Sequence, residues 1–104
     1  AHDIKEDASM SNAYVVGQVT VKNPDKWSEY RSKVPETFGP WGVEPVFRGT
    51  QFAALAGSCP HADIVVLRFP SAAAVEGWFA SPAYQALIAL RDEAADVVLT
   101  AYAA

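Results

Sequence analysis

Apolar and polar residues alternate near the start of the chain, and this alternation predicts a β-strand over residues 14–22 (YVVGQVTVK). Asn23, Pro24 and Asp25 follow with a side-chain acceptor for a helix cap, a proline suited to the first turn and a carboxylate near the positive end of the helix dipole. Apolar residues then recur at steps of three and four, at Trp27, Tyr30, Val34 and Phe38. We therefore expect a helix that begins after Asn23 and is kinked or ended by Pro35.

The middle of the chain carries further strand patterns and a loop signal. Residues 44–49 and 51–57 are rich in apolar side chains, and we expect them to form one strand interrupted at residues 49–50 by a bulge or a hairpin tip. Residues 58–61 indicate a loop. Residues 62–70 are almost continuously apolar, which is typical of a strand covered on both faces.

Two serines mark helix starts in the last third of the chain. We expect one helix after Ser71, a second, continuous helix over residues 81–96, and a final strand over residues 97–103. The order β-α-β-β-α-β predicts a ferredoxin-like α+β fold, with a four-stranded antiparallel sheet and helices on one face. The other face is then bare although its strands are apolar, and a second copy of the chain is the economical cover. We therefore expect a homodimer joined through the sheet face.

Short motifs follow one another in a fixed order over residues 14–103. They are Tyr14-Val15-Val16-Gly17, Asn23-Pro24-Asp25-Lys26, Phe47-Arg48-Gly49, Phe69-Pro70-Ser71, Trp78, Ser81-Pro82-Ala83-Tyr84-Gln85 and Arg91. Together they resemble the uncharacterised domain-of-unknown-function family 1330, of the dimeric α+β barrel superfamily. The resemblance implies a ferredoxin-like protomer and a dimer. Relatives in that superfamily include cofactor-independent monooxygenases, isomerases, haem-dependent proteins and ligand-sensing modules, so the resemblance implies a pocket but no particular reaction.

Length and charge limit the class of protein and its partners. The 104 residues fit one domain, and 12 acidic against 8 basic residues give a formal net charge of −4. A nucleic-acid partner is not expected, because nucleic-acid binding draws on clustered positive charge. No stretch reaches the roughly 20 apolar residues of a membrane-spanning helix, and no segment resembles a secretory signal. We therefore expect no membrane partner and a cytoplasmic location.

The beginning of the chain differs in composition from the rest. Residues 1–12 are mostly polar, and they contain Met10, the only methionine. They are interpreted either as a remnant of an expression vector, with Met10 as the native start, or as a natural disordered extension. In both interpretations a single domain occupies residues 13–104.

One predicted helix face carries the strongest candidate chemistry. Tyr84 and Arg91 lie seven residues apart, so Arg91 shares the otherwise apolar face that looks inward. A buried guanidinium needs a partner. In the functional interpretation, Arg91 and the Tyr84 hydroxyl bind a carboxylate, enolate or phosphate of a small ligand between helices and sheet. In the structural interpretation, Arg91 forms an ion pair, for example with Asp92 or Asp63.

Three further residues are candidates, each with a structural alternative. Arg48 precedes Gly49, which leaves room for a ligand, and the structural alternative is that Arg48 is an edge-strand charge or part of a dimer ion pair. The resemblance to a superfamily with cofactor-independent oxygenases implies that Trp78 and Tyr84 are candidates to line a pocket for a planar phenol or quinone. In the structural interpretation they are ordinary core residues. His61 is a candidate general base, oriented by Asp63, or an inert surface histidine.

The remaining polar residues of the domain point to structural roles. Arg68 interrupts an apolar strand, so we expect it to meet Glu44 or to reach solvent. The only cysteine, Cys59, cannot form an internal disulfide, and nothing in the sequence marks it as a nucleophile. No spacing of metal ligands and no phosphate-binding loop is found, so we expect neither a metal nor a bound cofactor.

These observations support one leading hypothesis and one alternative. The leading hypothesis is a homodimer with a pocket between sheet and helices that takes a small organic acid or phenol. An enzyme of this kind performs cofactor-independent oxygenation or isomerisation, with Arg91 stabilising negative charge and Tyr84 or His61 moving a proton. The alternative is a non-catalytic ligand-binding or interaction dimer in which these residues are structural.

Overall fold

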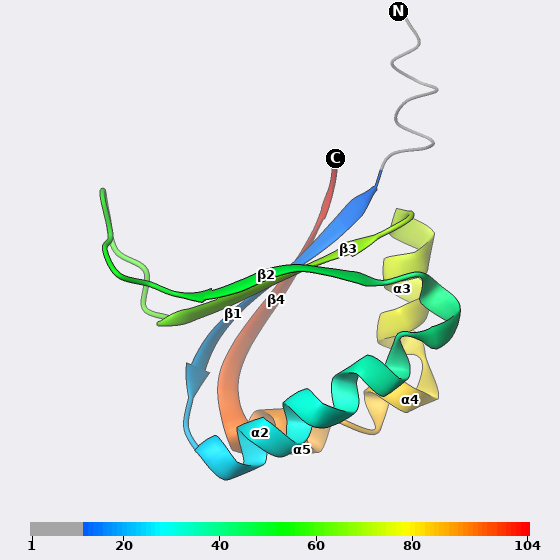
Figure 1. Ribbon diagram of the computed structural model, residues 1–104, viewed down its shortest axis with the longest axis horizontal. Helices are drawn as coiled ribbons and strands as arrows, with labels where there is room; N and C mark the ends of the chain where they lie inside the picture. The colour runs from blue at the N-terminus through cyan, green and yellow to red at the C-terminus, as the bar shows by residue number, and fades with distance from the viewer. Residues whose placement is uncertain (1–11) are drawn as a thin grey trace, which may run out of the picture.

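Four strands form one antiparallel sheet, in the order β2-β3-β1-β4, and the helices lie on one side of it (Figure 1). The computed structural model describes residues 12–104, so the expectations for residues 1–11 lie outside the described residues. The elements are β1 (Ala13–Val21), α2 (Pro24–Lys33), β2 (Glu44–Thr50), β3 (Asp63–Phe69), α3 (Ala72–Ala80), α4 (Pro82–Gln85), α5 (Ile88–Ala94) and β4 (Ala95–Ala103). This arrangement confirms the predicted ferredoxin-like α+β fold.

The alternation along β1 separates a helix-covered face of the sheet from an outer face. Ala13, Val15, Gly17 and Val19 are buried, whereas the residues that alternate with them are only half-buried. Opposite Ala13 and Val15, Phe69 and Leu67 of β3 are buried as well. The core therefore lies between this face and the helices, where Trp78 and Tyr84 are the largest fully buried side chains.

Helix α2 begins and ends where the sequence predicts. The Asn23 side chain accepts a hydrogen bond from the backbone N–H of Lys26 at 3.1 Å, and Pro24 occupies the first turn. The helix ends at Lys33, and a 3-10 turn over Val34–Thr37 contains Pro35. Proline cannot donate the backbone bond that would continue the helix, so the expected break is confirmed.

Residues 51–57 are not a strand, which corrects the expectation that they extend the preceding one. The ladder ends at the pair Thr50 and Asp63, followed by a single backbone hydrogen bond from the Gln51 N–H to the Ala62 carbonyl at 2.6 Å. Beyond Gln51 the segment has no neighbouring strand in the described residues with which to pair. Phe52 and Leu55 are almost fully exposed there. In Figure 1 this segment forms the long loop between β2 and β3, which projects past the sheet.

The expected continuous helix over residues 81–96 is two helices, which is a second correction. Helix α4 ends at Gln85, and the backbone N–H of Leu87 donates to the carbonyl of Tyr84 at 2.9 Å, a tight turn of the 3-10 kind. The last residues of the expected helix, from Ala95 onward, already belong to β4. No glycine or proline marks this break, so it follows from tertiary packing rather than from local propensity.

Within residues 12–104, none of the helices is both long and apolar enough to cross a membrane. The expected cytoplasmic location stays a prediction.

Candidate functional site

A cavity of about 340 Å³ lies between α2 and the helix-covered face of the sheet. Its volume is at the lower end of the range of roughly 300–1,000 Å³ for small-molecule sites. Most of the lining is apolar: Val15, Val19, Val34, Phe38, Leu67 and Leu99. The space can therefore hold the apolar part of a small ligand, and the few polar groups at its edge would determine which ligand binds.

A second hollow of about 330 Å³ adjoins the cavity and is more polar. Val19, Trp27, Arg31, Arg48 and Val65 line both spaces. The second hollow alone is lined by Thr50 and Asp63, whose side chains are joined by a hydrogen bond of 2.9 Å. The two hollows thus form an apolar chamber with a polar vestibule beside it.

A β-bulge places Arg48 on the cavity side of the sheet. Pro45 pairs with Leu67, but Phe47 pairs with the next residue of β3, Val66, so that Val46 is an extra residue in β2. Side chains alternate between the two faces of a strand. Because of the extra residue, Arg48 lies opposite Val65 on the cavity side, and Phe47 lies on the outer face.

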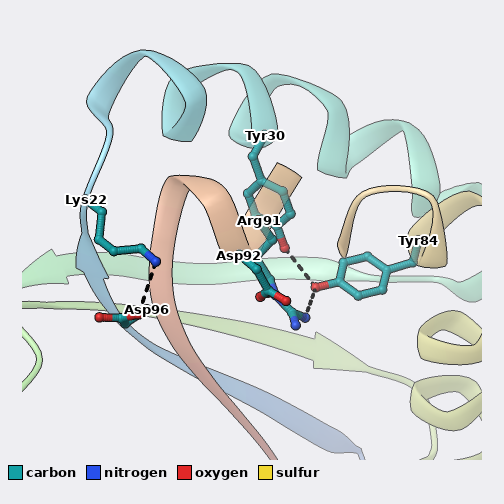
Figure 2. A network of polar contacts seen from close by, with 6 residues as sticks. All are labelled: Lys22, Tyr30, Tyr84, Arg91, Asp92 and Asp96. Carbon is teal, nitrogen blue, oxygen red and sulfur yellow. Dashed lines mark hydrogen bonds and ion pairs between the residues drawn. The ribbon is translucent and has the colours of Figure 1, made fainter. Parts of the chain in front are cut away.

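Three side chains from three helices meet behind the cavity, as Figure 2 shows. The hydroxyls of Tyr30 (α2) and Tyr84 (α4) are 2.9 Å apart, and Arg91 Nη1 (α5) donates to the Tyr84 oxygen at 3.0 Å. Arg91 Nε donates to Asp92 Oδ1 at 3.1 Å. The sequence predicted that Arg91 and Tyr84 share an inward face, and their contact agrees with that placement.

The same contacts shift two pKa values upward. Burial, together with the neighbouring Tyr84, raises the pKa of Tyr30 far above its ordinary value, so its hydroxyl keeps its proton. Burial works against the charge on Arg91, but hydrogen bonds to Tyr84 and Asp92 outweigh it and raise the pKa of Arg91. Arg91 is a cation at every physiological pH, and Tyr30 is a hydrogen-bonding acid.

Trp78 closes one end of the cavity and joins it to the tyrosines. Its side chain is buried, its ring lies 4.3 Å from that of Tyr84 between centroids, and its Nε1 donates to Thr37 Oγ1 at 2.8 Å. Trp78 is among the lining residues of the cavity and Tyr84 is not. Of the two aromatic candidates, Trp78 therefore meets the cavity directly, and Tyr84 reaches it through Tyr30, which also lines it.

His61 lies away from these residues, in the loop before β3. Its Nδ1 is 2.9 Å from Thr20 Oγ1, so a threonine, and not the expected Asp63, orients the ring. The carboxylate of Asp63 is engaged by Thr50 instead. Cys59 is exposed, and its Sγ approaches the backbone oxygen of His61 at 3.7 Å. The structure thus separates His61 from Tyr84 and Arg91.

The outer face of the sheet carries an ion pair and several exposed apolar side chains. Arg68 Nη2 donates to Glu44 Oε1 at 2.6 Å, which confirms the expected partner within the same chain. Phe47, Val98 and Tyr102 on this face are about half exposed, at 53%, 47% and 54%. Within residues 12–104, no group of three or more histidine, cysteine, aspartate or glutamate side chains is placed to hold a metal ion.

Two residues of this site were not singled out for chemistry by the sequence pattern. Tyr30 was predicted only as a core residue, and no role was predicted for Arg31. The position of Arg31 at the cavity was predictable from helical spacing, because Arg31 lies four residues after Trp27 and so shares the edge of the same helix face. A cation beside an apolar helix face is a feature that periodicity alone can find.

Fold and cavity together define a ferredoxin-like α+β protein with a ligand-sized space between sheet and helices. The chain belongs to the family described as "Domain of unknown function (DUF1330)", whose model matches residues 12–103. A comparison with curated proteins finds no match.

Solved structures agree on the fold. RPA0582, a protein of unknown function from Rhodopseudomonas palustris, is 18% identical, with a TM-score of 0.71 over 97% of this chain and 92% of that one. SnoaB, a cofactor-independent oxygenase from Streptomyces nogalater, is 10% identical, with a TM-score of 0.66 over 90% and 93%. A dimeric ferredoxin-like protein of unknown function from Thermobifida fusca is 13% identical, with a TM-score of 0.62 over 90% and 92%. At these identities the similarity establishes the fold.

Proposed function

We propose that this protein is a homodimer in which each protomer binds a small organic molecule in the cavity between α2 and the sheet. The observation that carries the proposal is the cavity itself, a space of about 340 Å³ lined mainly by aliphatic and aromatic side chains, with the buried residues Val15, Val19, Leu67 and Trp78 at its inner wall. Interiors of folded proteins are close-packed, so an opening of this size that reaches a buried tryptophan is unusual. A ligand-binding role explains why the space is left open.

The outer face of the sheet provides the evidence for the homodimer. In one protomer the strand β2 is exposed along its whole length, and the half-exposed side chains of Phe47, Val98 and Tyr102 lie on a face that no helix covers (Figure 1). Covering such a face with a second copy removes apolar area from water. A protein of similar fold from Thermobifida fusca is described as dimeric, which supports a dimer here by analogy.

A pair of adjacent valines provides the test of ligand binding. Val65 lines the cavity, whereas its neighbour Val66 pairs with Val16 and faces outward. We expect the native protein to bind phenylpropanol, a small neutral probe, in calorimetric titration. Val65→Phe should abolish this binding because the larger ring fills the space, and Val66→Phe should retain it. Absence of binding to the native protein, or equal binding by both variants, would overturn the proposal.

Cofactor-independent proton transfer is a second candidate function, favoured by the chain of groups that leads from Arg91 through Tyr84 to Tyr30. In the arrangement in which Tyr84 donates to Tyr30, the proton of Tyr30 is directed toward the cavity that Tyr30 lines. An enolate bound there takes the proton of Tyr30, and Tyr30 takes that of Tyr84. The negative charge then rests on the Tyr84 oxygen beside the Arg91 guanidinium.

Ketonisation of an enol separates this candidate from binding alone. The probe is the enol of phenylpyruvate, and the readout is the rate at which its ultraviolet absorbance falls as the enol carbon takes up a proton. Catalysis predicts ketonisation faster than in buffer for the native protein and for Tyr102→Phe. Tyr30→Phe and Tyr84→Phe should both return the rate to that of buffer. A native protein that does not accelerate ketonisation leaves the cavity as a binding site and rejects this candidate.

A further inference from the structure

The two arginines that line both hollows come from opposite walls. Arg31 lies on α2 and Arg48 on β2, so they face the same opening from the helix side and from the sheet side. The chain has four arginines, and the other two are satisfied by protein groups: Arg68 by Glu44, and Arg91 by Asp92 and Tyr84. Arg31 and Arg48 make no ion pair with any carboxylate in residues 12–104.

Each of these two cations acts on the other. Partial burial and the nearby charge of Arg31 lower the pKa of Arg48, and Asp63 offsets only part of this effect. Like charges held close together without an anion between them raise the energy of the protein. An anion placed between the two guanidinium groups would remove this repulsion and would gain charge-assisted hydrogen bonds from both.

The surroundings of the pair define the ligand further. Asp63, the carboxylate of the vestibule, already accepts a hydrogen bond from Thr50, and it leaves one net positive charge beside the two arginines. That balance matches a singly charged group better than a doubly charged phosphate ester, which would meet the carboxylate of Asp63. On the other side of the arginines the lining is aliphatic and aromatic. The ligand that fits is therefore apolar at one end and singly anionic at the other.

We propose that Arg31 and Arg48 form a carboxylate clamp, and that the natural ligand is an amphipathic monocarboxylic acid whose apolar part occupies the cavity. This inference rests on the proposed function, because it names the chemical class of the ligand for the same cavity. It also assigns roles to two residues: Arg48 holds the carboxylate from the sheet edge, and Arg31 holds it from the helix. The carboxylate end lies toward the vestibule, and the apolar end lies toward Leu67 and Leu99.

The test compares phenylpropionate with phenylpropanol, two probes that share the ring and differ in the anionic group. We expect the native protein to bind phenylpropionate about tenfold more tightly than the alcohol, and added salt should reduce this preference. Arg48→Met and Arg31→Met keep the apolar stem and remove the charge. Each should lose much more affinity for the acid than for the alcohol, so that the preference for the acid disappears. Lys33→Met, on the same helix but outside the cavity lining, is the matched control.

The possible outcomes separate the clamp from the cavity. Equal affinity of the native protein for acid and alcohol, or a preference for the acid that survives in both arginine variants, would overturn the clamp and leave the proposed binding function intact. If neither phenylpropionate nor phenylpropanol binds to the native protein or to Val65→Phe, the proposed binding function is refuted together with the clamp. Tighter binding of phenyl phosphate than of phenylpropionate would replace the carboxylate by a phosphate ester and so reject the ligand class named here.

Discussion

Individual side chains behind the cavity depend on one another for their hydrogen bonds. Tyr84 is fully buried, and its oxygen joins Tyr30 to Arg91. A buried polar group that loses its partner costs more than the bond contributed, because water cannot replace it. Tyr84 is therefore the residue on which this cluster depends.

Removal of one oxygen should show this dependence. Tyr84→Phe keeps the ring that packs against Trp78 but leaves Arg91 Nη1 and the Tyr30 hydroxyl without their partner. We expect the free energy of unfolding to fall by about 1–3 kcal/mol in urea titrations at fixed protein concentration. Tyr102→Phe removes a tyrosine hydroxyl outside this cluster and is the matched control. Equal losses for the two variants would contradict a shared network.

Tyr30 should make the stability of the protein depend on alkaline pH. Its ordinary pKa is 10.0, and burial holds the pKa of the folded state far above that value. Above pH 10 the unfolded chain releases this proton while the folded protein keeps it, so rising pH favours unfolding by about 1.4 kcal/mol per pH unit for this group. Tyr30→Phe should remove that contribution. Urea titrations on both sides of pH 10 check this, and parallel curves for the two proteins would contradict it.

Contacts between candidate residues were predictable from the sequence only where both residues lie in one predicted helix. Arg91 and Tyr84 lie seven residues apart, and helical spacing was enough to place them together. The partner of Tyr84 is Tyr30, 54 residues away, and that contact depends on how α2 packs against α4 and α5. His61 was expected beside Asp63 because the two are close in sequence, but the loop turns it toward Thr20. Proximity in sequence does not determine side-chain direction in a loop.

Among the secondary-structure elements, α3 is fitted closely to the turn that precedes β2. A Cβ atom built on Gly77 of α3 would lie 2.7 Å from Cη2 of Trp41, well inside ordinary contact distance. Trp41 belongs to the 3-10 turn Gly39–Trp41, which ends at Gly42 with a positive φ of 67°. The absence of a side chain at position 77 thus lets the indole ring lie against the helix.

This contact reverses the usual effect of a substitution in a helix. Glycine in a helix interior is less favourable than alanine by about 1 kcal/mol, so Gly77→Ala would ordinarily stabilise the protein. Here we expect a loss of about 1–3 kcal/mol, because the new methyl group overlaps the indole of Trp41. Chemical denaturation measures the change. In a Trp41→Leu background the same substitution should become neutral or stabilising, and a loss of the same size in both backgrounds would disprove the overlap.

Elements were predictable where local chemistry and periodicity agreed. Both agree for α2, with its cap at Asn23 and its end before Pro35, and for β1 with its alternating burial. The prediction of a strand over residues 51–57 was wrong because it relied on apolar content alone. The pairing with β3 ends at Thr50, so these residues have no partner in that strand. The break after Gln85 was not predicted because the residues around it favour a helix. Tertiary packing, and not local propensity, divides the segment into two helices.

For the whole molecule, the hydrophobic content of 51% divides between two places. One part fills the space between helices and sheet, around Phe69, Trp78 and Tyr84. Another part lies on the outer face of the sheet, where Phe47, Val98 and Tyr102 remain half exposed in a single protomer. This division is the physical basis for the proposed dimer.

A charge on the outer face should separate the two copies. Val98→Lys places an ammonium group where the partner sheet would pack, and its desolvation opposes association. We expect light scattering at micromolar concentration to give twice the chain mass for the native protein and one chain mass for the variant. Glu29→Lys, on the solvent side of α2, changes charge in the same direction and should remain dimeric. A native monomer would refute the dimer.

The extra residue in β2 also determines how this strand tolerates a change in its length. Val46 has no partner in β3, so its deletion would remove the bulge and leave Phe47 opposite Val66 and Arg48 opposite Val65, on the faces they occupy now. Pairing of Val46 itself with Val66 would instead shift every following residue by one position and turn Phe47 toward the cavity. We therefore expect relatives that lack this one residue to keep the same side chains at the cavity and on the outer face.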